Sequence, residues 1–204
     1  MLLRINPDNP EGRKIKQVVE VLRQGGVIIY PTDTVYGLGC DIFQQKAVDR
    51  ICHLRGINPE KARLSFICKD IADISEYTTQ IDNQTFKLLK KNLPGPFTFV
   101  LKSGNKLPKI FKNNKKTIGI RIPKNNIVTA IIEELGHPMM TSSLKSDDEL
   151  LEYFTDPIDI YEDFKKRVDL VIDGGIGGNI HSTVVDCTEA DVEIIREGAG
   201  ELMV

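Results

Sequence analysis

The sequence predicts a mixed α/β (α+β) fold, in which one three-layer domain over residues 1–204 surrounds a twisted β-sheet. Short apolar runs with strand character interleave with stretches whose apolar residues recur at helical spacing. No internal repeat or long linker divides the 204 residues. Because several strand-like runs follow one another without a helix between them, we expect the sheet to contain both parallel and antiparallel pairs.

The N-terminal half opens with a predicted helix. We expect Asn9 to cap this helix, Pro10 to occupy its first turn, and Gly25 with Gly26 to end it. Apolar residues recur between these signals with a period of three to four. The elements expected next are strand Val27–Tyr30, helix Gln45–Leu54, strand Leu64–Cys68, and a helix over Asp82–Lys91 that ends before Pro94.

In the C-terminal half, the sequence predicts more strands than helices. Phe97–Leu101 and Thr117–Ile122 are rich in β-branched and aromatic residues, and the second alternates isoleucine with smaller or polar residues. A helix over Asn126–Leu135 is expected to end at Gly136. The remaining predicted elements are strand Met139–Ser142, helix Pro157–Lys166, and strands Val168–Ile172, Thr183–Val185 and Val192–Ile195.

Composition is typical of a soluble globular protein, with 41% hydrophobic and 27% charged residues. No apolar run approaches the roughly 18 residues of a membrane span, and the first residues contain no secretory signal, so we expect a cytoplasmic protein with no membrane contact.

The cysteines form no Cys-x-x-Cys pair and have no histidine at ligand spacing. We therefore expect free thiols and no bound metal. The cysteines are Cys40, Cys52, Cys68 and Cys187.

The stretch from Tyr30 to Asp41 reads Tyr-Pro-Thr-Asp-Thr-Val-Tyr-Gly-Leu-Gly-Cys-Asp. It follows a buried-strand run, so it predicts a polar loop at the carboxyl end of a strand, where open α/β sheets bind ligands. Its glycines allow a turn or a close approach to a ligand. The alternative is an ordinary strand-to-helix turn.

Other strand ends repeat this pattern of hydroxyls and cations. Arg121 lies between Ile120 and Ile122, so by alternation it faces away from the core and can clamp a carboxylate or a phosphate. A surface salt bridge is the alternative for Arg121. Thr141 begins a run of three hydroxyl residues that can bind phosphate oxygens or simply cap the strand. Similar segments begin at His181 and Ile194.

Two common nucleotide-binding loops are absent from the sequence. It contains neither a Gly-x-x-x-x-Gly-Lys-Ser/Thr loop nor a Gly-x-Gly-x-x-Gly fingerprint. The glycine-rich segment Gly174–Gly178 fits neither spacing, so we interpret it as a flexible connection. If the protein binds a nucleotide, it must do so through dispersed contacts at strand ends.

Charge is segregated along the chain although the net charge is only −2. Every charged residue from Lys87 to Lys124 is basic, whereas residues 147–163 are crowded with Asp and Glu. A basic face can attract the phosphates of RNA, although lysines on different elements can also point in unrelated directions. The candidate RNA-binding residues are Lys102, Lys109, Lys112, Lys115 and Lys116.

Six segments, taken in order along nearly the whole chain, resemble motifs of the YrdC family. The segment Asn6–Pro10 and the Arg-Glu-Gly sequence at 196–198 resemble the YciO subgroup in particular. The six segments are Pro31–Gly39, Pro94–Thr98, Ile118–Pro123, Thr141–Ser143, Ser182–Asp186 and Ile195–Gly198.

This resemblance implies a twisted sheet around a large, concave, basic cavity and an association with double-stranded RNA or tRNA. Well-understood members are threonylcarbamoyl-AMP synthases, which join L-threonine, bicarbonate and ATP, with Mg²⁺, and release pyrophosphate. Their product is used to make the N6-threonylcarbamoyladenosine of tRNA. Since a carbamate oxygen attacks the α-phosphate in line, catalysis depends mainly on positioning and charge neutralisation.

The resemblance also implies which residues form the site. Those expected to bind the amino-acid substrate are Thr32, Thr34, Tyr36, Arg55 and Arg121. Those expected to bind the nucleotide and its phosphates are Thr141, Ser143, Lys145, Ser182, Thr183 and Arg196.

The sequence departs from the synthases at two positions. Synthases carry Lys-x-Arg after the second helix, where this chain has His53 and Arg55, and they carry Asn where this chain has Lys145. A neutral imidazole would remove a charge from the phosphate site, and each lost catalytic hydrogen bond of this kind costs on the order of 2–4 kcal/mol. Lys61 with Arg63 can restore such a pair, although at a different spacing.

Three hypotheses follow. The first is a YciO-like paralogue that binds nucleotide or RNA and has weak or altered synthase activity. The second is a full threonylcarbamoyl-AMP synthase in which Lys145 or Lys61 supplies the missing cation. The third is an RNA-binding or ribosome-associated module without catalysis.

Overall fold

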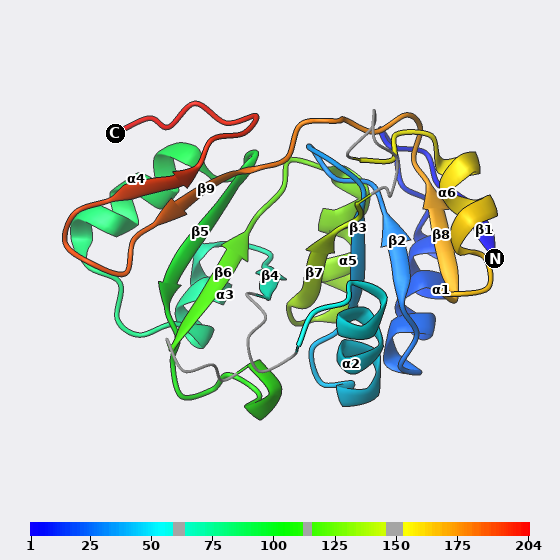
Figure 1. Cartoon of the computed structure of the whole chain (residues 1–204), viewed down its shortest axis with the longest axis horizontal. Coiled ribbons are helices and arrows are strands. Elements are labelled where there is room, and N and C mark those ends of the chain that lie inside the picture. The colour runs from blue at the N-terminus through cyan, green and yellow to red at the C-terminus, as the bar shows by residue number, and fades with distance from the viewer. Residues whose placement is uncertain (59–63, 112–115, 146–152) are drawn as a thin grey trace.

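A ten-stranded mixed sheet organises the computed structural model of the protein, which describes residues 1–58, 64–111, 116–145 and 153–204 (Figure 1). The strand order across the sheet is β1-β8-β2-β3-β7-β4-β6-β5-β9-β10. The strands are β1 (Leu2–Arg4), β2 (Ile28–Tyr30), β3 (Gly37–Asp41), β4 (Ser65–Ile67), β5 (Phe97–Lys102), β6 (Thr117–Arg121), β7 (Met139–Ser143), β8 (Leu170–Asp173), β9 (Thr183–Asp186) and β10 (Glu193–Arg196).

The sheet pairs strands in both senses, which confirms the predicted mixed α/β class. The parallel pairs are β1/β8, β2/β8, β4/β6 and β5/β9. The antiparallel pairs are β2/β3, β3/β7, β4/β7, β5/β6 and β9/β10. Antiparallel pairs arise where the chain turns back without a crossover helix, as between β2 and β3.

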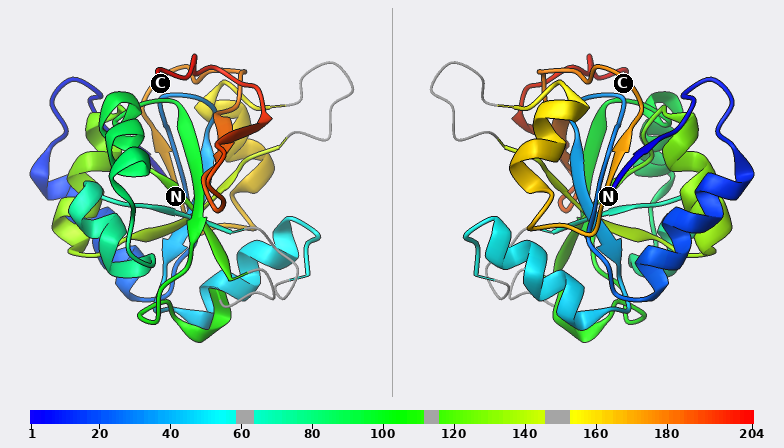
Figure 2. Two further views of the ribbon diagram at one scale, coloured as in Figure 1. Left: turned by 90° about the vertical axis from the view of Figure 1, so that its left-hand side faces the viewer. Right: turned by 90° about the vertical axis from the view of Figure 1, so that its right-hand side faces the viewer.

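Helices lie on both sides of the sheet. Figure 2 shows α1, α3, α4 and α5 on one side of the molecule and α2 and α6 on the other. None of the helices in the described part of the chain is long and apolar enough to cross a membrane. The helices are α1 (Gly12–Arg23), α2 (Gln45–Leu54), α3 (Ile71–Tyr77), α4 (Asn83–Asn92), α5 (Asn126–Leu135), α6 (Pro157–Phe164) and the short 3-10 helix η1 (Lys109–Phe111).

Apolar faces predicted from periodicity form the core. In α1 the buried residues are Ile15, Val18, Val19 and Leu22, and they join one hydrophobic cluster with α5. A larger cluster contains the inward residues of α2, α3, α4 and α6. Both clusters are built on the sheet, so its strands are held from two sides and their ends are fixed in position.

The start of α1 corrects one prediction. Asn9 does not cap this helix, which begins at Gly12 with Glu11 in the N-cap position. The reason is a turn before the helix, in which the Asn6 side-chain oxygen accepts hydrogen bonds from the backbone N–H groups of Asp8 and Asn9. Gly25 ends the helix as predicted, with a φ of +82°.

The strand β3 corrects another prediction. Gly37–Asp41 was expected to continue the polar loop, but it forms a fully buried strand between β2 and β7. A Cβ at Gly39 would lie 2.7 Å from the Tyr30 ring, so the aromatic side chain of the neighbouring strand occupies the space above this glycine. The loop proper is therefore limited to residues 31–36.

Candidate functional site

The central strands turn a face with most of their polar side chains towards a cavity, while the opposite face is apolar. On β5, Phe99 and Leu101 belong to the core, whereas Thr98, Val100 and Lys102 line a cavity. The same alternation places Thr117, Gly119 and Arg121 of β6, Thr141 and Ser143 of β7, and Val184 and Asp186 of β9 on the cavity side. Because these strands are neighbours in the sheet, the residues form one surface, to which Ser142 of β7 also contributes.

This surface forms the floor of a cavity of about 690 Å³. Of the described residues that line it, five are cationic and two are acidic, so positive charge predominates. The cations are Arg55, Lys102, Arg121, Lys145 and Arg196, and the acids are Asp186 and Glu189. Seven of the eleven residues predicted to bind substrate or nucleotide line this cavity: Arg55, Arg121, Thr141, Ser143, Lys145, Ser182 and Arg196.

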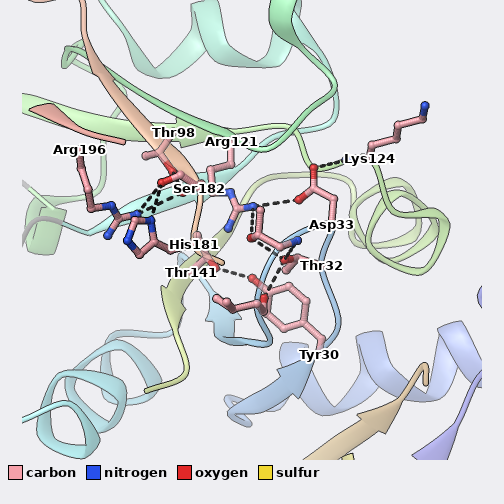
Figure 3. A network of polar contacts seen from close by, with 12 residues as sticks. Tyr30, Thr32, Asp33, Thr98, Arg121, Lys124, Thr141, His181, Ser182 and Arg196 are labelled. Atoms are coloured by element: carbon pink, nitrogen blue, oxygen red, sulfur yellow. Dashed lines mark hydrogen bonds and ion pairs between the residues drawn. The ribbon is translucent and has the colours of Figure 1, made fainter. Parts of the chain in front are cut away.

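Arg121 is held by the polar loop that follows β2 (Figure 3). Its Nη2 donates hydrogen bonds to Asp33 Oδ1 at 3.0 Å and to Thr34 Oγ1 at 3.0 Å. Asp33 Oδ2 accepts a further hydrogen bond from the backbone N–H of Lys124. The Arg121–Asp33 ion pair is buried, unlike the surface pair considered from sequence, and Arg121 also lines the cavity.

A further hydrogen-bond donor of Arg121 is its Nε–H group. Its Nε is buried and has no hydrogen-bond acceptor among the described residues. A buried N–H of a cation without an acceptor is costly, and a ligand carboxylate or phosphate would satisfy it. The geometry therefore permits Arg121 to bind an anion while it remains paired with Asp33.

Thr32, Thr34 and Tyr36 are not among the described residues that line the cavity, and their hydrogen bonds fix the loop that pairs with Arg121. Thr32 Oγ1 accepts a hydrogen bond from Thr34 N and donates one to the Val35 carbonyl, which fixes the turn. Thr34 is buried and reaches Arg121. Tyr36 donates to the carbonyl of Gly175, and burial raises the pKa of its hydroxyl to about 12.

The glycine-rich segment Gly174–Gly178 is packed against this loop, which corrects its interpretation as a flexible connection. The N–H of Gly178 donates to the Thr34 carbonyl, and the N–H of Gly174 donates to the Tyr36 hydroxyl. A Cβ at Gly178 would lie 2.4 Å from the Thr34 carbonyl oxygen. Glycine therefore allows a close contact that fixes the loop.

Ser182, directly before β9, contacts Arg196 of the edge strand β10. Arg196 Nη2 donates to the Ser182 carbonyl at 2.9 Å, and the Ser182 and Thr98 hydroxyls are 2.8 Å apart. Figure 3 shows Arg196 beside Ser182 and His181. Thr183 is not among the described residues that line the cavity: its hydroxyl is buried and bonded to the backbone of Gly198 and Gly200, and its contact with the nucleotide stays a prediction.

Thr141 links the cavity floor to the core. Its Oγ1 lies 2.5 Å from the hydroxyl of Tyr30, and burial raises the pKa of Tyr30 to about 12. The neutral phenol is therefore retained at physiological pH, and Thr141 keeps a fixed orientation in the cavity.

The two departures from the synthase pattern lie in different places. His53 is exposed on α2 and is not among the residues that line the cavity, whereas Arg55, just after α2, is. Lys145 does line it, beside Ser143. The Lys61 and Arg63 alternative lies outside the described residues.

Three of the five lysines predicted to bind RNA lie among the described residues, and they belong to different elements of the fold. Lys102 lines the cavity and pairs with Glu189 at 3.5 Å. Lys109 lies on η1, and Lys116 precedes β6 with a φ of +52°. Lys112 and Lys115 lie outside the described residues, so RNA binding stays a prediction.

Cysteine and metal chemistry is limited in the described ranges. The four thiols are free, three of them buried, and burial raises their pKa values, that of Cys187 to about 12. No group of three or more His, Cys, Asp or Glu among the described residues could hold a metal ion.

Several cavity residues were not identified from the sequence. Ser65, Thr98, Val100, Val184 and Asp186 all line the cavity. The signal was available in β5, where Thr98 and Val100 alternate with core residues. Without knowledge of which strands are neighbours, however, alternation does not show which face is open.

Comparisons with known proteins identify the family of the chain. The Sua5/YciO/YrdC family model, described as "Telomere recombination", matches residues 20–198. The uncharacterized protein YciO of Escherichia coli is 42% identical over 200 residues, which cover 97% of this chain and 95% of that protein. The threonylcarbamoyl-AMP synthase of Pyrococcus abyssi is 29% identical over 188 residues, 91% of this chain but only 54% of the relative.

Solved structures of YciO and Sua5 have the same fold as this chain. The crystal structure of E. coli YciO superimposes with a TM-score of 0.92 at 40% identity, covering 98% of this chain and 97% of that one. Sua5 of P. abyssi complexed with L-threonine superimposes with a TM-score of 0.87 at 27% identity, covering 97% of this chain and 57% of that one.

Proposed function

The chain belongs to the Sua5/YciO/YrdC family, and on this premise we propose that its cavity binds ATP and L-threonine and supports chemistry of the threonylcarbamoyl-AMP synthase type. The observation that carries the proposal is Arg121, whose buried Nε lacks an acceptor among the described residues and which lines the same cavity as Ser182 and Arg196. The relationship to a synthase and the threonine complex of P. abyssi Sua5 add support.

The proposed reaction has two steps. The amine of threonine attacks bicarbonate, and loss of water leaves a carbamate. A carbamate oxygen then attacks the α-phosphate of ATP, and the bond to the bridging oxygen breaks as pyrophosphate leaves. Both steps bring anions together, so the site must hold them in place and offset their charge.

In this proposal, different residues of the cavity bind the threonine carboxylate and the phosphates. Arg121 would hold the threonine carboxylate through Nε and a second guanidinium N–H, in the bidentate manner that suits a carboxylate. Arg196, Ser182 and Ser143 would donate to phosphate oxygens. Mg²⁺ would enter with ATP, bound by phosphate oxygens, which are the hard ligands that it prefers.

Lys145 is the residue through which we expect the activity to differ from that of the synthases. It brings a mobile point charge to a position where, by resemblance, synthases carry a neutral amide. We therefore place the protein with YciO-like paralogues of altered activity. His53 is exposed, which argues against the phosphate-site loss considered from sequence.

A pyrophosphate-release assay with threonine, bicarbonate and magnesium ATP tests the proposal. Release should require all three substrates, and Arg121→Lys should lower kcat/KM for threonine at least about 10-fold, because lysine keeps the charge but loses the Nε donor. Arg13→Lys on the exposed surface of α1 is the matched control and should have no effect. Release that does not depend on threonine, or equal behaviour of both variants, would contradict the proposal.

A further inference from the structure

Arg196, a proposed phosphate contact, lies on a strand at the edge of the sheet. It is the last residue of β10, which pairs with β9 alone among the described strands and has all four residues exposed. The pairing register shifts between Ile194 and Arg196, so a bulge interrupts the ladder of hydrogen bonds beside this arginine. A short edge strand with an interrupted ladder frays easily, so contacts outside the sheet must fix the backbone at Arg196.

The segment 197–200, which follows β10, makes such contacts. The backbone N–H of Ala199 donates to the His181 carbonyl at 2.9 Å. A Cβ at Gly198 would lie 2.3 Å from the same carbonyl oxygen, so only glycine allows this close approach. The segment therefore lies directly against the part of the chain that carries Ser182.

The Thr183 hydroxyl is the centre of this contact. It donates to the Gly200 carbonyl at 2.7 Å and accepts from the backbone N–H groups of Gly198 at 3.1 Å and of Gly200 at 3.0 Å. Thr183 is 1% exposed, so its hydroxyl uses its donor and both of its lone pairs within the protein. Without this hydroxyl, three backbone groups of the segment after Arg196 would lose their partner.

A second anchor holds the chain further along. Asn92 of α4 is 4% exposed, and its amide forms two hydrogen bonds with the backbone of Met203. Asn92 Oδ1 accepts from Met203 N at 2.9 Å, and Nδ2 donates to the Met203 carbonyl at 2.8 Å. Nδ2 also donates to the Leu88 carbonyl of the same helix. The chain after β10 is therefore bonded to the sheet at Thr183 and to α4 at Asn92.

We propose that Thr183 is a positioning residue for Arg196: its hydroxyl holds the segment after β10 and thereby fixes the guanidinium for the phosphates of the nucleotide. Arg196 Nη2 donates to the Ser182 carbonyl at 2.9 Å and lies 3.4 Å from Ser182 Oγ, so both proposed phosphate contacts depend on the same backbone. This inference rests on the proposed function, since it takes the cavity to be the nucleotide site.

Calorimetric titration with ATP tests the assignment. Thr183→Val keeps the shape of the side chain but removes the hydroxyl, so ATP should bind about 10-fold more weakly, the size of one hydrogen bond to a charged group. Thr183→Ser keeps the hydroxyl and should bind ATP within about 2-fold of the wild type. The affinity for L-threonine should not change in either variant, because Asp33 and Thr34 hold Arg121 independently.

The variant Arg196→Ala shows whether Thr183 acts through this arginine. In the Arg196→Ala background, Thr183→Val should weaken ATP binding by no more than about 2-fold, since the group that it positions is gone. A full further loss would mean that Thr183 contacts the nucleotide itself, and it would overturn the positioning role. Asn92→Leu removes only the second anchor and should weaken ATP binding about 3-fold, the size of one ordinary hydrogen bond, so it tests the proposal if Thr183→Val does not fold.

Thr78→Val is the control, because it makes the same change at another buried threonine, whose hydroxyl donates to the Ile74 carbonyl. Thr78 is not among the described residues that line the cavity, so ATP affinity should stay the same. Unchanged ATP affinity in Thr183→Val, or in Asn92→Leu where Thr183→Val does not fold, would overturn the assignment. Equal weakening in Thr183→Ser or a parallel loss of threonine binding would do so too. Failure of the wild type to bind ATP would instead overturn the proposed function.

Discussion

Among single residues, Arg121 and Asp33 combine burial with charge. Their side chains are 7% and 10% exposed, so removing them from water is costly. That cost is offset because both carboxylate oxygens of Asp33 accept hydrogen bonds, from Arg121 and from the Lys124 backbone. The ion pair therefore fixes the guanidinium before any ligand arrives.

Removing one partner of this pair should destabilise the fold more than removing both. Arg121→Ala leaves Asp33 buried with one oxygen unsatisfied, so we expect the free energy of unfolding to fall by about 3 kcal/mol. Adding Asp33→Ala should restore part of the loss. Urea unfolding of the single and double variants measures this coupling, and strictly additive effects would show that the two side chains do not interact.

Because of Tyr30, we expect the free energy of unfolding to decrease at high pH. Burial raises its pKa from 10.0 to about 12, so above pH 10 the unfolded chain releases this proton before the folded chain does. The contribution of Tyr30 to the free energy of unfolding is fully present below pH 10 and is lost towards pH 12. At pH 11 the loss from this residue alone is about 1.4 kcal/mol.

Urea unfolding of the wild type and of Tyr30→Phe at pH 8 and pH 11 tests this expectation. The variant loses the contact with Thr141 at both pH values, but it should show a smaller decrease between them. An equal decrease in both proteins would contradict the assignment to Tyr30.

Among elements, the periodic segments were predictable and the glycine-rich ones were not. Helices α2 and α5 have the residue bounds expected from their apolar spacing, and β5 differs by one residue. The strand β3 was missed because Gly37 and Gly39 are poor strand formers, and only the Tyr30 ring of the next strand explains them. The short elements β1 and α3 carried too little periodicity to be recognised.

The glycine segment Gly174–Gly178, which is packed against the polar loop, should be sensitive to an added side chain. Gly178→Ala would force the segment away from the Thr34 carbonyl, so we expect a loss of about 1–3 kcal/mol in the free energy of unfolding and a higher KM for threonine. Gly12→Ala is the control, since a Cβ there meets nothing within 4 Å. Thermal unfolding of both variants measures the difference, and similar melting temperatures would contradict the proposed close contact.

For the whole molecule, the candidate site is assembled from distant parts of the chain. Its cations range from Arg55, after α2, to Arg196 on the last strand, and the sheet order brings β6, β5 and β9 together between them. The sequence identified many of these residues through short motifs. It could not show that Thr183 turns to the backbone, because neighbouring strands decide that orientation.

Ligand binding should stabilise the whole fold. ATP at about 100 times its Kd should raise the free energy of unfolding by about 2.7 kcal/mol. At the same concentration Arg196→Ala should reduce this gain, because it removes a proposed phosphate contact. Thermal unfolding with and without ATP measures both, and an unchanged gain in the variant would place the phosphates elsewhere.

In our proposal, one cavity holds both the amino acid and the nucleotide. A crystal structure of the protein with L-threonine and a non-hydrolysable ATP analogue tests it most directly. We predict the threonine carboxylate on Arg121 Nε and phosphate oxygens within hydrogen-bond distance of Ser182 and Arg196. Either ligand bound at another surface, or a cavity that holds neither at saturating concentrations, would contradict the account.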